Sequence, residues 1–198
     1  MTDTAFLQQL LNLPEHGEIQ RFLQNVQRAH IKKGTALVEP GQVQAQLIIL
    51  VSGVFRGFLL DAEGRDITDC FAFRAGEILM GCNDLTEPSQ IHLEAVTDSD
   101  VLLLPMEDVL AALEEIPELM EIYNFFLRKA LAQHWEGKML MHQCTAMERY
   151  QWFLREYPGL IDAVSNKHIA SFLGMTPVTL SRLRRKLRDE KLAGIREE

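Results

Sequence analysis

Four basic side chains near the end of the chain, Arg182, Arg185, Lys186 and Arg188, carry the strongest chemical signal in this sequence. An arginine presents paired N–H donors that match two acceptors on guanine, and both arginine and lysine neutralise phosphate. Arg182 or Arg185 is therefore suited to reading guanine, and Lys186 and Arg188 are suited to the phosphate backbone. Together these side chains predict contact with double-stranded DNA.

The spacing of the neighbouring residues predicts a helix with two different faces. Leu180, Leu183 and Leu187 fall on one side when each residue turns the chain by about 100°. The opposite side carries a valine and three polar or basic residues: Val178, Ser181, Arg182 and Arg185. A buried leucine stripe behind a basic strip suits a helix that lies in the major groove. The alternative interpretation is a basic surface helix that is simply solvated.

A shorter helix is expected just before this one. Ser165 or Asn166 can cap it, and Gly174 fits the left-handed position that ends a helix. Thr176 then caps the basic helix, with Pro177 at its first position. The pattern predicts a helix-turn-helix. The predicted DNA-contacting residues are Lys167, Thr176, Val178, Thr179, Ser181, Arg182, Arg185, Lys186 and Arg188.

The distribution of charge supports DNA binding by this segment alone. The 198 residues carry a formal net charge of −8. Residues 166–192 nevertheless hold seven Lys and Arg against two Asp and Glu, a net charge of +5, whereas residues 1–165 have a net charge of −12. Such an asymmetry confines the cationic field to one small module.

The rest of the chain predicts an α+β protein. Residues 1–30 have the apolar spacing of helices, and residues 30–105 form short β-type runs punctuated by glycine. Many short strands at regular intervals indicate an antiparallel barrel or jelly roll, with residues 62–66 at a hairpin tip. The expected domains are a β-roll with flanking helices at 1–116, a long helix at 117–144 and the helix-turn-helix at 145–198.

The long helix predicts a homodimer. Apolar residues recur every three or four positions over some 25 residues after Pro117. A small barrel cannot cover a helix of that length, so we expect it to pair with its copy in a second subunit. The alternative is that it packs lengthwise on its own domain. The residues expected at the dimer contact are Leu119, Tyr123, Phe126 and Ala130.

Composition argues against several other classes of protein. The apolar runs are too short to span a bilayer, and the first residues lack the pattern of a signal peptide. Three scattered cysteines without a CxxC pair indicate reduced thiols, so we expect a cytoplasmic protein. A metal-dependent enzyme on a small barrel needs clustered histidines, yet His92 is the sole histidine between His30 and Pro105. We expect no enzyme activity, no metal and no cofactor. A sensor that has lost DNA binding is the other alternative.

In this order of elements the chain resembles the Crp/Fnr family of bacterial transcription regulators. The resemblance is strongest in MERYQWFLREYP and SNKHIASFLGMTPVTLSRLRRKL, and moderate in the glycine pattern from KKGTALVEPG to FRAGEI. It implies a sensor roll like a cyclic-nucleotide-binding domain, a dimer helix and a palindromic operator. RNA polymerase is a further partner that it implies.

The sequence departs from the family where cyclic nucleotides bind. The family cassette has a Gly-Glu pair that holds ribose and an Arg, followed by Ser or Thr, that clamps phosphate. Here the cassette opens with Gly76-Glu77, but the inner pair reads Gly81-Cys82 and the Arg step reads Gln90-Ile91. A neutral amide replaces a guanidinium poorly, so cyclic AMP and cyclic GMP are not expected as effectors. The residues expected around the pocket are Gly76, Glu77, Gly81, Cys82, Gln90 and Ile91.

Other effectors and the operator remain open at this point. Three thiolates are too few for a four-iron cluster, and no histidine stands in a diagnostic haem arrangement. An oxidant-sensing Cys82, Arg56 or Arg74 reaching a phosphate, an unidentified small molecule and no ligand at all remain alternatives. The family's acidic base reader corresponds to Val178, so the operator should differ from those of well-known members. After Leu192 only AGIREE remains, which predicts a short or missing wing.

Overall fold

A computed structural model describes residues 2–11, 13, 17–82 and 84–194. Residues 195–198, on which part of the expectation of a short or missing wing falls, lie outside the described residues. The chain divides into two compact units, each described by itself below. Unit 1 comprises Met1–Leu59 and Asp69–Ala132, and unit 2 comprises Leu60–Thr68 and Gln133–Glu198.

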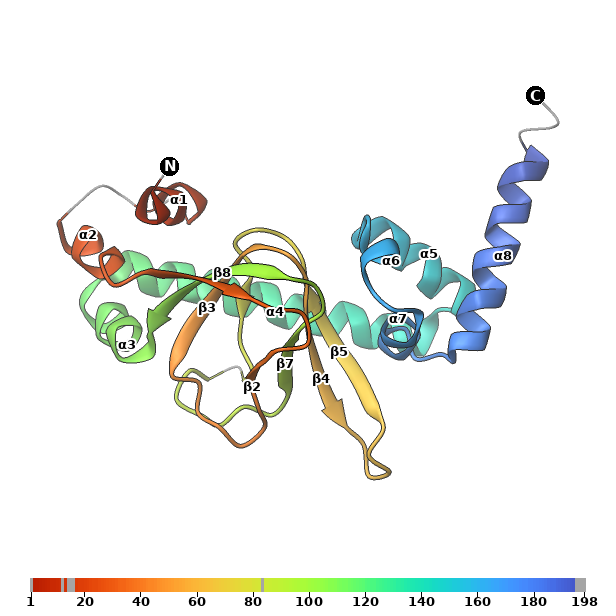
Figure 1. Ribbon diagram of the computed structural model, residues 1–198, viewed down its shortest axis with the longest axis horizontal. Coiled ribbons are helices and arrows are strands. Elements are labelled where there is room, and N and C mark those ends of the chain that lie inside the picture. Colours follow the sequence, from red (N-terminus) through yellow and green to blue (C-terminus); the bar gives the residue numbers. More distant parts are fainter. Residues whose placement is uncertain (1, 12, 14–16, 83, 195–198) are drawn as a thin grey trace. The chain divides into compact units, whose positions relative to one another are not determined.

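Unit 1 contains a β-roll of two four-stranded antiparallel sheets (Figure 1). The first has the order β1-β8-β3-β6 and the second the order β2-β7-β4-β5. The strands of the first sheet are β1 (Gln27–Ile31), β8 (Ser99–Pro105), β3 (Gln46–Ser52) and β6 (Ile78–Leu79). Those of the second are β2 (Ala36–Val38), β7 (His92–Ala95), β4 (Phe55–Leu60) and β5 (Asp66–Ala72). The predicted jelly-roll architecture is confirmed.

The two faces of β3 separate two apolar cores. Ile48 and Leu50 point between the sheets, where they join Phe55 and Leu93 in one buried cluster. Ile49, on the opposite face, joins a second cluster that the helices cover. These helices are α1 (Asp3–Leu10), α2 (Gly17–Leu23), α3 (Met106–Glu115) and the start of α4 (Pro117–Gln143). Successive side chains of a strand point to opposite faces, so β3 contributes buried residues to both layers.

The N-terminal region differs from the expectation of helices throughout residues 1–30. The second of the two short helices, α2, ends at Leu23, and Gln27–Ile31 is strand β1. The strand pairs with β8, with Gln27 opposite Leu103 and Ile31 opposite Ser99. Cross-strand pairing therefore overrides the apolar spacing that suggested a helix here.

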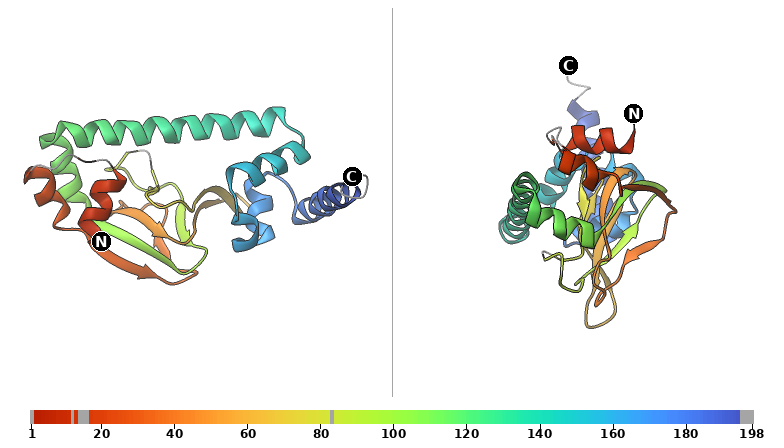
Figure 2. Two further views of the ribbon diagram at one scale, coloured as in Figure 1. Left: turned by 90° about the horizontal axis from the view of Figure 1, so that it is seen from above. Right: turned by 90° about the vertical axis from the view of Figure 1, so that its left-hand side faces the viewer.

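The 27-residue helix α4 runs continuously through the division between the units (Figure 2). Unit 2 then adds α5 (Ala146–Glu156), α6 (Leu160–Ala163), α7 (Asn166–Phe172) and α8 (Pro177–Gly194). Thr145 begins α5 with a capping box, in which Glu148 accepts from the Thr145 N–H at 2.7 Å. The hydrogen bonds to Glu148 from Thr145 hold the pKa of this carboxyl below its usual range.

No helix in the described part of the chain combines the length and apolar character that crossing a membrane requires.

Candidate DNA-binding surface and effector cassette

The predicted helix-turn-helix is present as α7 and α8. Ser165 caps α7 by accepting from the His168 N–H at 3.3 Å, and Thr176 accepts from the Thr179 N–H at 3.1 Å at the start of α8. Gly174 lies between the helices with φ 60°, in the left-handed region where glycine has no side chain to clash. These local features fix where one helix ends and the next begins.

The inner face of α8 packs into an apolar core. Leu180, Leu173 and Ile169 are fully buried, and Phe153 of α5 is buried beside them in the same unit. Aromatic rings from α5 and α7 surround this core: Trp152, Phe153, Tyr157 and Phe172. Because the leucine face is used in this way, rotation of α8 is fixed and its opposite face must point outward.

The outward face of α8 carries the side chains that the sequence assigned to DNA. Val178 is 60% exposed. The structure shows no hydrogen bond or ion pair for Arg182 or Arg185 among the described residues, and both are exposed. Lys186 and Arg188 contact acidic neighbours only at 3.9 Å. The exposed members of the predicted set are Lys167, Thr176, Val178, Ser181, Arg182, Arg185, Lys186 and Arg188, and Thr179 is partly buried.

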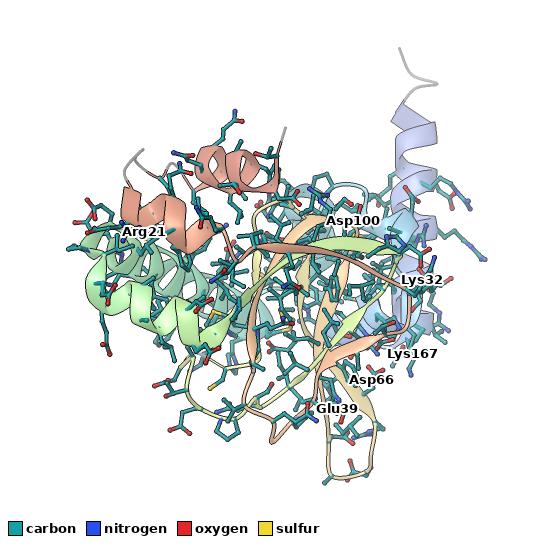
Figure 3. The ribbon with its side chains drawn as sticks, turned by 60° about the vertical axis from the view of Figure 1, so that its left-hand side comes forward. Arg21, Lys32, Glu39, Asp66, Asp100 and Lys167 are labelled. Atoms are coloured by element: carbon teal, nitrogen blue, oxygen red, sulfur yellow. The ribbon has the colours of Figure 1, made fainter. Side chains whose placement is uncertain are left out.

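Lys167 differs from Arg182 and Arg185 because a carboxylate from outside its own helix lies near it. Its Nζ lies 3.7 Å from Asp66 Oδ2, and Figure 3 shows the two side chains together. Asp66 belongs to the hairpin segment Leu60–Thr68 of unit 2. The same segment is tied to α7 through Ser171, whose Oγ accepts from the Thr68 N–H at 3.0 Å and donates to the Asp66 carbonyl. Nothing in the residue spacing predicted this contact.

The faces of α4 are used differently from the expectation. Leu119 is buried in the core of unit 1, and Tyr123 packs against the same core. Phe126 and Ala130 are partly buried. The expected dimer residues Leu119 and Tyr123 thus cover the chain's own roll. The large apolar side chains that α4 exposes most lie elsewhere: Phe125 (56%), Leu131 (59%), Trp135 (53%) and Met139 (46%).

The first two residues of the cassette, Gly76 and Glu77, form hydrogen bonds with neighbouring backbone groups of the roll. The Glu77 carboxylate accepts from the N–H groups of Phe73 and Arg74 at 2.7 and 3.0 Å, and its other oxygen lies 3.6 Å from Arg74 Nη1. The Gly76 N–H donates to the Leu50 carbonyl at 2.8 Å. This carboxylate is therefore already engaged by the backbone that surrounds it.

The inner part of the cassette is closed by Ser89, which is 5% exposed. Its Oγ donates to the Ile91 carbonyl at 2.6 Å, and a Cβ added at Gly81 would overlap the Ser89 Oγ. Gln90, at the position of the family's phosphate-binding Arg, is exposed, while its N–H donates to the Gly81 carbonyl. The structure thus joins Gly81 to Gln90 through the backbone, and the Ser89 side chain holds Ile91.

The cavity beside Cys82 is too small for a nucleotide. It has a volume of about 10 Å³ and is lined by Cys82 together with Gln44, Met80, Asp84, Leu85, Glu87, Ser89 and Met106. A space of this size holds one water molecule at most. No group of three His, Cys, Asp or Glu among the described residues is placed to hold a metal ion.

The two arginines considered as substitute phosphate ligands have partners of their own. Arg56 is 4% exposed, and its Nη2 lies 2.9 Å from Glu94 Oε2 on the paired strand. Its guanidinium also stacks on Phe58, 4.1 Å from the ring centroid. Arg74 contacts Glu77 and lies over the ring of Phe73. Both side chains are thereby held by acidic and aromatic neighbours in the roll.

Two contributors to the helix-turn-helix escaped the sequence analysis. Arg149 of α5 donates hydrogen bonds to three backbone carbonyls around the helix ends. Asp66 reaches Lys167 from the hairpin. The Thr145-x-x-Glu148 spacing is a sequence signal for the capping box that begins α5, but spacing does not reveal either long-range contact.

Comparison with known proteins shows similarity at the level of the fold. FixK2 from Bradyrhizobium japonicum superposes with a TM-score of 0.77 at 20% identity, covering 84% of this chain and 86% of that one. CLP from Xanthomonas campestris, described as a c-di-GMP-responsive global regulator, gives 0.71 at 18% identity over 90% and 94% of the two chains. A chain from Eubacterium rectale assigned as a transcriptional regulator of the Crp/Fnr family gives 0.71 at 20% identity over 91% and 87%.

The sequence matches no protein-family model and no curated protein sequence. The structural likeness extends over most of the chain, so the fold is that of the Crp/Fnr-type regulators.

Proposed function

We propose that this chain is a DNA-binding transcription regulator that reads a palindromic operator with α8. The observation that carries the proposal is the pair Arg182 and Arg185, which are exposed and have no hydrogen bond or ion pair in the described part of the chain. They lie on the face of α8 opposite Leu180, which is fully buried. Arg182 donates to guanine in the major groove, Val178 contacts a thymine methyl group, and Lys186 and Arg188 contact phosphates.

The regulator acts as a homodimer in this proposal, through the exposed apolar face of α4. Phe125, Ala132, Trp135 and Met139 are separated by seven, three and four residues, which fits the seam of a two-stranded coiled coil. An apolar stripe of this kind is costly to leave in water, and a second copy of the helix would cover it. The two recognition helices would then read half-sites about one helical turn apart. The protein would work in the cytoplasm, with RNA polymerase as a further partner.

The roll, in this proposal, does not respond to cyclic AMP or cyclic GMP. Its Glu77 carboxylate is engaged by backbone N–H groups, Gln90 is exposed, and Ser89 fills the space beside Gly81. A bound phosphate would therefore lack the guanidinium that compensates its buried charge. Calorimetry of the full chain with both nucleotides tests this part, and micromolar binding of either would contradict it.

The DNA-binding part is tested by selection from a random duplex pool. The wild-type protein should enrich a palindrome, and Arg182→Ala should weaken binding to that palindrome by about 1–3 kcal/mol. Affinity for random DNA should change far less, because it depends on phosphate contacts. Arg155→Ala is the matched control, since Arg155 is exposed on α5 and contacts only the neighbouring Glu156 in the described part of the chain. Equal losses on both DNAs would exclude Arg182 as a base reader.

The dimer is tested by Trp135→Asp, which places a charge on the exposed apolar face of α4. The variant should sediment as a monomer, and operator affinity should fall by roughly a hundredfold because two linked half-sites become one. Gln133→Asp introduces the same charge at another exposed position of α4 and should stay dimeric. A Trp135→Asp protein that remains dimeric would place the subunit contact elsewhere.

A further inference from the structure

Arg149 joins three helix ends within unit 2. It lies on the first turn of α5, and its Nε donates to the Leu173 carbonyl at 2.9 Å. Nη1 donates to the Cys144 carbonyl at 3.0 Å, and Nη2 donates to the Gly174 carbonyl at 3.4 Å. One planar guanidinium therefore contacts the residue after α4 and the two residues after α7.

These carbonyls are the groups that a helix end leaves without an intrahelical partner. Cys144 follows the last residue of α4, and Leu173 and Gly174 form the turn from which α8 begins. A cation placed at the C-terminal ends of two helices also interacts favourably with both helix dipoles. The three nitrogens of one guanidinium each reach a different carbonyl, whereas the ammonium group of lysine is a point charge that cannot span them.

Other contacts around Arg149 also join the end of α4 to α5 and to the turn before α8. Glu148 and Thr145 form the capping box that fixes the first turn of α5 directly after α4. Met141 of α4 approaches the turn from its own helix, since its Sδ lies 3.1 Å from where a Cβ on Gly174 would be. Trp152 Nε1 donates to Glu136 Oε1 at 2.9 Å and ties α5 to α4 further along. The turn before α8 is thus connected to the final turns of α4.

We propose that Arg149 is a positioning residue that sets the direction of α8 relative to the end of α4, and thereby the half-site spacing that the dimer accepts. This inference rests on the proposed DNA-binding function. In a two-fold dimer, the separation of the recognition helices follows from how each leaves the dimer helix, and it must match the spacing of the half-sites. Arg149 contacts no base in this scheme and acts only through the backbone of the turn.

The experiment uses the full chain and the palindrome that the wild-type protein enriches. Dissociation constants are measured for Arg149→Lys and Arg149→Met on that palindrome, on versions with one base pair added or removed at the centre, and on a single half-site. Arg155→Met, on the same helix, is the control. The wild-type protein and the control should prefer the original spacing.

Arg149→Lys should lose about tenfold on the original spacing, as expected when hydrogen bonds of a charged group are lost. It should lose much less on the altered spacings and on the half-site, so that the preference between spacings largely disappears. Arg149→Met should show the same pattern wherever its circular dichroism spectrum is that of the folded protein.

An equal loss on all the DNAs, accompanied by a lower melting temperature, would overturn the inference, because a purely structural role lowers the fraction of folded protein without changing the ratio between spacings. An unchanged ratio at full affinity would overturn it as well. A wild-type protein that enriches no palindrome would instead contradict the proposed function, and this inference with it.

Discussion

On α8 the side chains of Arg182 and Arg185 extend into solvent, whereas in the cassette the Glu77 carboxylate and the Ser89 hydroxyl are hydrogen-bonded to nearby backbone groups. Both segments are short polar stretches of the chain that lie next to a buried apolar layer. A surface that binds a partner must leave hydrogen-bonding groups available, because a group already paired inside the protein gains little from a new contact. By this criterion α8 is built for an external partner and the cassette is built for the stability of the roll.

Glycine shows the same difference between the two regions. Gly174 adopts a left-handed conformation at the turn before α8, and a Cβ added there would lie 3.1 Å from the sulfur of Met141, a tight contact. Gly81 has no space for a side chain, because Ser89 occupies the position where a Cβ would lie. The first glycine shapes the turn before α8, and the second permits close packing inside the roll.

Among the variants that test this difference between α8 and the cassette, Gly81→Ala should have the largest effect, and the effect should be on stability. The added methyl group overlaps Ser89, so the free energy of unfolding should fall by about 1–3 kcal/mol in urea denaturation. Gly137→Ala in α4 is the control, since nothing lies within 4 Å of the added Cβ there, and it should be neutral or stabilising. Adding Ser89→Gly should recover part of the loss. At a temperature where all variants are folded, operator affinity should be unchanged. A changed affinity would show that the cassette influences α8, and it would contradict a purely structural role for the cassette.

A smaller effect, on DNA binding alone, is expected from Lys186→Ala. Lys186 is exposed, and its acidic neighbour Glu190 lies at 3.9 Å, a contact that solvent screens. Removing one phosphate contact should weaken operator and random DNA alike and lower the slope of log affinity against log salt by about 1. Lys129→Ala, at an exposed position of α4, should leave the slope unchanged. A loss confined to the operator would mean that Lys186 reads a base.

The sequence predicted what depends on neighbours along the chain. The Ser165 and Thr176 caps, the left-handed Gly174 and the burial of Leu180 follow from local spacing, and the structure confirms them. The other two leucines of the predicted face, Leu183 and Leu187, are only partly buried. Long-range pairing was harder to anticipate. Gln27–Ile31 became a strand because β8 offers it a partner, and Leu119 turned toward the roll because unit 1 has an apolar core there.

The candidate site likewise contains residues that local spacing could predict and residues that depend on long-range contacts. Side chains that point to solvent on α8 could be assigned from helical phase alone, since no tertiary contact decides their role. Arg149, Asp66 and Ser89 act through partners distant in sequence or through space filling, so residue type and spacing carry no signal for them. Family resemblance identified the cassette, but it did not reveal that Gln90 is exposed and Glu77 already engaged.

The smallest expected effect concerns the thiol of Cys70 in β5. Burial raises the pKa of Cys70 to about 12, with the charge of Asp69 adding to the effect, and its Sγ lies against Gly57. In a Cys82→Ser, Cys144→Ser background, Cys70 should resist iodoacetamide at pH 8–9 in the folded protein and react quickly in urea. The ordinary value of 9.0 applies to the unfolded chain, which therefore loses this proton first as the pH rises. The contribution of Cys70 to stability should be complete below pH 9 and should decline between pH 9 and about 12. A Cys70→Ala variant in the same background should not show this decline. Rapid alkylation of Cys70 in the folded protein at pH 8 would contradict the prediction, because it would show that the thiol is accessible to solvent.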